Sequence, residues 1–176
     1  MAMPRLLNRR EWDAFLKPAA FAGVGAGAIF AAEILLEYAC QPRNNILWGY
    51  LEFGSTFLIY ALVAAWVAWR GDMVRGSAIA AMTSAMVASL IWCIALLGVF
   101  YIFEGTATQT AVLIAEGEPQ DFLSSGMANY RTFLIEDLFG ATFFHLLLGP
   151  AIAGLLGLMF SAASIALKRK LSALTR

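Results

Sequence analysis

Four long apolar blocks limit what this chain can fold into. They run over about residues 19–40, 46–69, 78–103 and 139–167. An α-helix rises 1.5 Å per residue, so about 20 apolar residues cross a hydrocarbon layer about 30 Å thick, and each block reaches that length. The composition agrees, because 61% of the residues are hydrophobic and 14% are charged, an excess over the usual balance of a soluble domain. We therefore predict an integral membrane protein.

The blocks are expected to be helices. A transmembrane β-strand alternates apolar and polar residues, whereas the run FLIYALVAAWVAW does not alternate. We predict an all-α, polytopic membrane protein: one membrane domain over residues 1–176, built as a bundle of four transmembrane helices. A long third loop, residues 104–138, is expected to be partly helical because Pro119 precedes a run that can begin a helix. None of the apolar blocks resembles a signal peptide, so we expect no segment to be removed.

The positive charges predict the orientation. Ten of the 12 Lys and Arg residues lie before the first block, in the turn at 70–77 or after the last block, and only Arg43 and Arg131 lie on the other side. Short cytoplasmic loops are rich in Lys and Arg. We therefore expect both termini in the cytoplasm, in a bacterial inner membrane. The formal net charge of zero gives no support to a nucleic-acid partner.

Small residues recur at every fourth position in three of the blocks. They are Ala19, Gly23, Gly27 and Ala31 in the first block, Ala81, Ala85, Ser89 and Cys93 in the third, and Ala153, Gly157 and Ser161 in the fourth. Such strips let helix backbones approach closely in a membrane. We expect them to hold the bundle together; a seam between two copies of the chain is the alternative.

The stretch AAEILLEYAC, residues 31–40, places two carboxylates within an apolar run. Glu33 and Glu37 are four residues apart and so share one helix face, and the helix rise places both in the outer half of the membrane. Glu52 falls at a similar depth. Charged groups at such depths normally face a protein interior or a wet cavity. We therefore predict an outward-open, acidic pocket that is partly covered by the third loop.

Six residues are candidates for binding a ligand or a proton in this pocket: Glu33, Glu37, Glu52, Tyr60, Asp137 and His145. Each also has a plainer explanation. Glu37 and Asp137 lie near enough to the boundary to be solvated, and a single histidine on an apolar face is often a hydrogen-bonded packing residue. Carboxylate and imidazole groups suit Mn, Fe or Zn, but no ExxH or HxxxH spacing occurs. The metal, the cofactor and any catalytic residue thus stay unknown.

Three stretches resemble a family of small four-helix bacterial inner-membrane proteins whose domain is of unknown function. They are LKPAAFAGVGAGAI, WVAWRGDMVRGSAIAAMTSAMVASLI and GPAIAGLLGLMFSAASIALKRK. The resemblance implies four spans, a short cytoplasmic turn with a basic start, a long helical third loop and a basic tail. It implies no activity, so it assigns no functional residue.

Three functional interpretations are compatible with these features. The first is a small membrane protein whose acidic pocket takes up a cation or protons, in a transport or accessory role. The second is a structural subunit whose carboxylates meet basic groups of larger membrane partners. The third is an enzyme that acts on lipid or quinone in the outer leaflet; a non-enzymatic role is favoured. The lipid bilayer is the one partner that the sequence identifies, and a homo-oligomer or a larger membrane complex is compatible with it.

Overall fold

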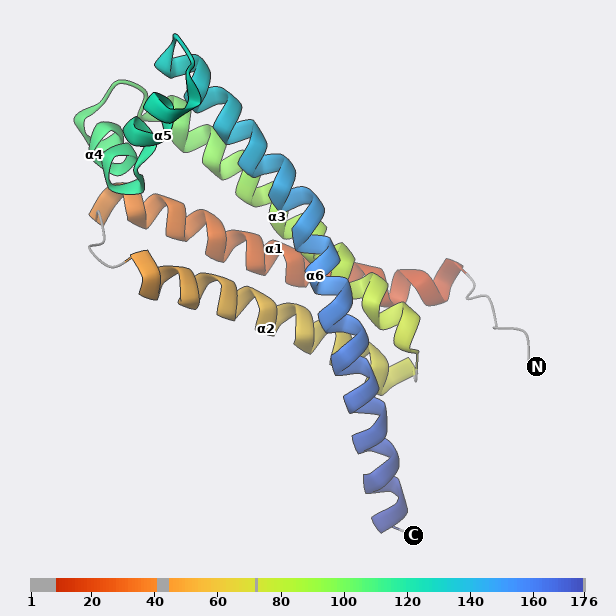
Figure 1. The fold of residues 1–176 in the computed structure, drawn as a ribbon. Coiled ribbons are helices and arrows are strands. Elements are labelled where there is room, and N and C mark those ends of the chain that lie inside the picture. Colours follow the sequence, from red (N-terminus) through yellow and green to blue (C-terminus); the bar gives the residue numbers. More distant parts are fainter. Residues whose placement is uncertain (1–8, 41–44, 72, 176) are drawn as a thin grey trace.

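The computed structural model describes residues 9–40, 45–71 and 73–175, but not the side chains of residues 9–11, 45–49 and 52. All the regular structure in these ranges is helical (Figure 1). The helices are α1 (Arg9–Cys40), α2 (Asn45–Gly71), α3 (Val74–Ile102), α4 (Ala107–Glu116), α5 (Glu118–Ser125) and α6 (Tyr130–Leu174). Four of them, α1, α2, α3 and α6, are long and apolar enough to cross a membrane. The predicted four-helix transmembrane bundle is therefore confirmed.

Helix α3 occupies the centre of the bundle, with α1 and α6 packed against it. Glycines allow the backbones of α1 and α6 to come close to the backbone of α3. A Cβ atom on Gly23 would collide with the backbone oxygen of Ser84, and one on Gly157 would lie 2.8 Å from the Cα atom of Ala78. The predicted strips of small residues lie in these two seams, so the backbones meet where the sequence removes side chains.

Helix α2 completes the bundle by packing against α6 and α3. Two side chains of α6 donate hydrogen bonds to backbone oxygens of α2. Ser164 Oγ lies 3.0 Å from the oxygen of Ala65, and Lys168 Nζ lies 2.8 Å from the oxygen of Trp69. These bonds fasten the C-terminal ends of α2 and α6 together.

Helix α6 is longer than its apolar block. It begins at Tyr130 rather than at residue 139, so the end of the predicted third loop is helical and continuous with the last span. The side chain of Asn129 caps this start by accepting a hydrogen bond from the backbone nitrogen of Thr132 at 3.0 Å. Phe133 and Leu138 are buried, which holds the added turns in the bundle. The helix then continues through Pro150 to Leu174.

The rest of the third loop forms the short helices α4 and α5. Gln109, which is 5% exposed, fixes the corner between α3 and α4. Its side-chain amide donates to the backbone oxygen of Phe100 at 3.1 Å and accepts from the backbone nitrogen of Gly105 at 2.9 Å. Gly117 then separates α4 from α5 with φ of 92°, in the left-handed region that favours glycine. Together these residues fold the loop back over the bundle, next to α1.

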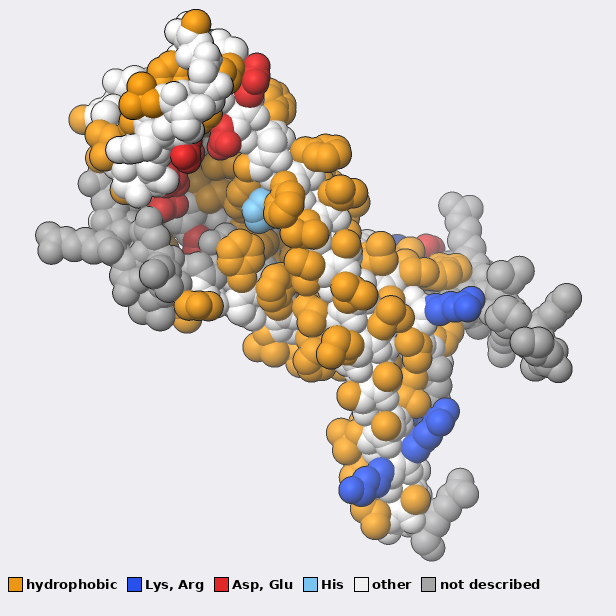
Figure 2. Space-filling view, in the orientation of Figure 1, with side chains coloured by type: hydrophobic (Ala, Val, Ile, Leu, Met, Phe, Trp, Pro, Cys, Tyr) orange, Lys and Arg blue, Asp and Glu red, His pale blue; other side chains and the backbone are white. Residues whose placement is uncertain are grey.

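The two ends of the bundle differ in charge (Figure 2). We call the end where α1 and α3 finish and α6 starts the acidic end; it carries α4 and α5 and most of the carboxylates. The opposite end, which we call the basic end, contains the C-terminal ends of α2 and α6. It carries Arg70, Lys168 and Arg169. Exposed aromatic residues occur at both ends, among them Tyr50 and Tyr101 at the acidic end and Trp66 and Trp69 at the basic end, as is typical of the two interfaces of a membrane.

Candidate functional site

A cavity of about 380 Å³ lies at the acidic end of the bundle. Helices α1, α3 and α6 form its walls, α4 and α5 cover it, and α2 contributes Phe53. Five carboxylates line it: Glu33, Glu37, Glu116, Glu118 and Asp137. No lysine or arginine is among the described residues that line it. The space is therefore strongly acidic.

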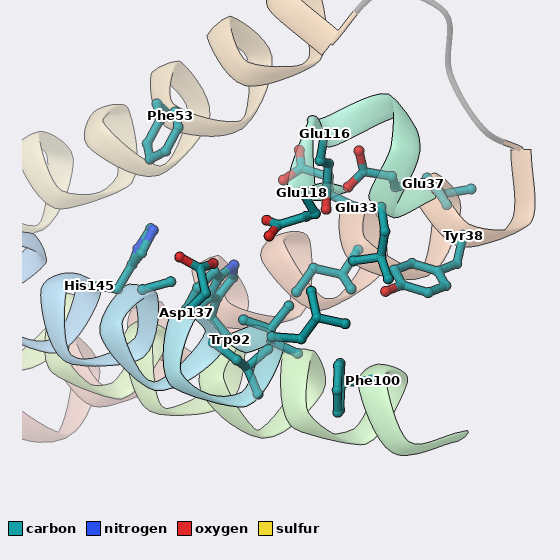
Figure 3. Close-up of a pocket in the computed structure, with 17 residues that line it drawn as sticks. Glu33, Glu37, Tyr38, Phe53, Trp92, Phe100, Glu116, Glu118, Asp137 and His145 are labelled. Carbon is teal, nitrogen blue, oxygen red and sulfur yellow. The ribbon is translucent and has the colours of Figure 1, made fainter. Parts of the chain in front are cut away.

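The local fold explains how the carboxylates meet (Figure 3). Glu33 and Glu37 lie one turn apart on α1 and face the cavity from the same side of that helix. Glu116 is the last residue of α4 and Glu118 is the first of α5. Because only Gly117 separates them, the sharp turn at this glycine directs both side chains into the cavity.

The other side of the cavity is aromatic. The ring of His145 stacks on Trp92, with ring centroids 4.0 Å apart and an angle of 24° between the planes. On the other side of His145, the Phe53 ring lies at 6.2 Å and 18°. Close by, Ser89 Oγ donates a hydrogen bond to the backbone oxygen of His145 at 3.3 Å. This three-ring stack joins α2, α3 and α6.

The carboxylates of the covering helices have unusual proton affinities. Burial raises the pKa of Glu116 to about 7, and the nearby charges of Glu37, Glu118 and Asp137 add to the increase. Glu116 as a whole is exposed, and its side chain lines the cavity. Burial also raises the pKa of Glu118, with smaller contributions from Asp137 and Asp121. Both glutamates are therefore easier to protonate than solvated ones.

No described basic group neutralises these carboxylates. Arg131, the basic residue expected near the pocket, pairs with Glu104 outside it, with 2.6 Å between Nε and Oε1. The hydrogen bond from Arg131 holds the pKa of Glu104 below its usual value. Within the cavity, one carboxylate oxygen of Glu33 and one of Glu118 are buried and accept no hydrogen bond from the described residues. The acidic lining thus has unused capacity to bind a positive group.

Four of the six residues predicted from the sequence line this cavity: Glu33, Glu37, Asp137 and His145. Tyr60 does not line it; its side chain is 3% exposed and lies in the hydrophobic core of the bundle. Glu52 lies in α2, but its side chain is outside the described residues.

The sequence analysis did not identify Glu116, Glu118, Trp92 or Phe53 as site residues. The one local signal was the pair of glutamates around a glycine in EGEP, residues 116–119, which marks a turn with two adjacent carboxylates. Trp92 and Phe53 gave no signal, because aromatic residues are common in any membrane helix.

The chain offers no metal site among its described residues and no match to known proteins. Among the described residues, no three His, Cys, Asp or Glu side chains are grouped closely enough to hold a metal ion. No family model, no curated protein and no solved structure matches the chain. The resemblance to small four-helix inner-membrane proteins therefore stays a prediction.

Proposed function

We propose that this integral membrane protein binds a cation, or takes up protons, in the acidic pocket as part of a transport or accessory role. One observation carries the proposal: five carboxylates line a single cavity, and no lysine or arginine is among the described residues of its lining. Uncompensated charges are costly inside or beside a membrane. The group is therefore expected either to hold protons or to attract a positively charged ligand.

The direction in which the carboxylates point favours this role over that of a structural subunit. A subunit that awaits basic groups from a partner would present its carboxylates on an outer face of the bundle. Here Glu33, Glu37 and Asp137 instead line one cavity between the helices, and α4 and α5 contribute two further glutamates to it. The pocket is thus assembled within one chain.

We further propose a bacterial inner membrane as the location, with the basic end in the cytoplasm. The support is the distribution of Lys and Arg, which follows the positive-inside pattern. In this orientation α4, α5 and the pocket lie at the outer side of the membrane, where the pocket can exchange protons or cations with the periplasm.

A thermal-shift titration of the purified protein tests the pocket. Sodium, potassium, magnesium and calcium would each be added at several pH values from 5 to 8. A ligand that binds only the folded state stabilises it by RT ln(1 + [L]/Kd). We expect at least one cation to raise the melting temperature, and we expect Glu116→Gln and Asp137→Asn to reduce this response.

Two matched variants separate the pocket from general surface charge. Glu136 neighbours Asp137 but does not line the cavity, and Glu104 pairs with Arg131 outside it. Glu136→Gln and Glu104→Gln should therefore keep the wild-type response. Equal loss in all four variants would mean that the cation acts on the overall charge, and an unresponsive wild type with no pH dependence would overturn the proposal.

A further inference from the structure

The size of the acidic pocket bears on the kind of cation that it fits. Its volume, about 380 Å³, is within the range of roughly 300–1,000 Å³ that is typical of pockets for organic molecules. Among the described residues, no three carboxylates are grouped closely enough to hold a metal ion. Both features favour a positively charged organic molecule over a single bare ion.

The lining is divided into a charged part and an apolar part. In Figure 3 the carboxylates of Glu37, Glu116 and Glu118 lie together beside α1, and Phe53 and His145 face each other at the opposite side. Asp137 is drawn between the two groups, next to His145. Trp92 and Leu96 continue the apolar side along α3. A ligand that matches this surface has a positive group at one end and an apolar group at the other.

The pocket opens towards the side of the bundle. Figure 2 views the helices from the side and looks into a hollow bordered by α6 and by the covering helices α4 and α5. Two apolar residues of the lining are partly open to the surroundings. Leu36 on α1 is 45% exposed and Phe53 on α2 is 42% exposed. They therefore supply an apolar part of the mouth of the pocket, next to the exposed carboxylates Glu116 and Asp137.

The depth of this mouth can be estimated from the helix rise. Phe53 lies about 24 Å along α2 from Trp69 at the basic end, and Glu37 lies about 30 Å along α1 from Lys17, at 1.5 Å per residue. The hydrocarbon layer is about 30 Å thick. Phe53 thus lies within the layer, near its far side, whereas Glu37 reaches the headgroups. Phe53 therefore faces lipid tails and Glu37 faces the interface, and Glu33, about 24 Å along α1 from Lys17, lies at the depth of Phe53.

We infer that the pocket binds an amphiphilic ammonium compound that enters sideways from the membrane leaflet at the acidic end. Its ammonium group lies among Glu37, Glu116 and Asp137, and its apolar part lies against Trp92 and Phe53. This inference rests on the proposed function, because it names the class of cation that the pocket holds.

A series of alkyltrimethylammonium ions tests it. The protein would be purified in a maltoside detergent, whose headgroup is uncharged, and titrated with the tetramethyl, butyl, hexyl and octyl members by calorimetry. A buried methylene strengthens binding roughly fourfold. We expect the affinity to rise at least about tenfold from tetramethylammonium to the octyl member, and 1-octanol, which has the same tail and no charge, to bind far more weakly.

Variants show whether the pocket is the source of this trend. Phe53→Ala shortens the apolar side at an exposed position, so the protein should stay folded while the gain with chain length becomes smaller. Phe144, which lies on α6, is 60% exposed and is outside the cavity; it supplies the control Phe144→Ala, which should behave as wild type. Glu116→Gln should weaken every member of the series by a similar factor.

The outcomes separate this inference from the proposed function. If sodium or another inorganic cation binds but chain length has no effect, the amphiphilic ligand is wrong and the cation pocket stands. If affinity rises only to the butyl member, the ligand is a small amine from water, and the membrane route is wrong. If no cation of either kind binds but the melting temperature depends on pH, this inference is wrong and proton uptake stands; if there is no pH dependence either, both proposals fail. If Phe53→Ala and Phe144→Ala show the same dependence of affinity on chain length, that dependence reflects partition of the alkyl chain into detergent. This result also overturns the inference.

Discussion

Glu116 is the residue whose charge most directly couples the pocket to pH. Its pKa is about 7 in the folded protein, because burial disfavours the carboxylate and Glu37, Glu118 and Asp137 repel it, against an ordinary value of 4.5. At a pH between these two pKa values, Glu116 is protonated in the folded state and ionised in the unfolded state. The free energy of unfolding contributed by this group is therefore fully present below about 4.5 and declines as the pH rises to about 7.

We expect the melting temperature, measured without added cation, to fall as the pH rises from 5 to 8. In Glu116→Gln the neutral amide cannot ionise, so most of this slope should disappear; the remaining slope comes from Glu118, whose pKa is raised as well. Glu104→Gln is the control, because that carboxylate pairs with Arg131 away from the pocket. A Glu116→Gln protein with the full wild-type slope would show that Glu116 does not titrate in this range.

At the scale of the helices, the seam between α1 and α3 depends on Gly23. A side chain there would push against the backbone oxygen of Ser84 and the Cβ atom of Val87, and backbone cannot move aside as the end of a flexible side chain can. We expect Gly23→Ala to destabilise the bundle by about 1–3 kcal/mol, the usual consequence of overpacking. Thermal unfolding in detergent would measure the change.

The same helix contains its own control. Gly25 has no atom within 4 Å of the place where a Cβ would lie, and alanine favours a helix over glycine by up to about 1 kcal/mol. Gly25→Ala should therefore leave the stability unchanged or raise it slightly. If both variants unfold like wild type, the α1–α3 seam does not depend on close backbone approach.

The helices also show where sequence-based prediction succeeds and stops. The spans were predictable because apolar length alone decides whether a helix crosses a membrane. The extension of α6 back to Tyr130 was not, since Arg131, Glu136 and Asp137 resemble loop residues. These three side chains remain exposed, while their neighbours Phe133 and Leu138 are buried. Only the cap at Asn129 marks this helix start locally.

The pocket is a property of the whole molecule, and for that reason the sequence predicted it only in part. Depth along a span located Glu33, Glu37, Asp137 and His145, because a charge inside the membrane needs a sheltered position. Glu116 and Glu118 reach the pocket only because the chain turns back after α3, at the corner that the hydrogen bonds of Gln109 to Phe100 and Gly105 hold. The hydropathy of the loop does not indicate that it folds back over the bundle.

The proposed orientation of the whole molecule gives a further prediction. A fluorescent protein fused after residue 176 should fold and fluoresce, because we place the C-terminus in the cytoplasm, whereas alkaline phosphatase at the same position should stay inactive. Alkaline phosphatase inserted near Gly126, in the turn after α5, should be active. The opposite pattern at both positions would mean that the bundle is inserted the other way round.

The central position of α3 also affects how the protein is made. The chain is synthesised from its N-terminus, so α1 and α3 can join along their glycine seam while the ribosome is still translating the segment before α6. Throughout that interval Glu33 and Glu37 lack the wall that carries Asp137 and His145. Translation of α6 is thus the step that shelters them, and a chain that stalled before it would expose a half-built acidic cleft to the chaperones and proteases of the membrane.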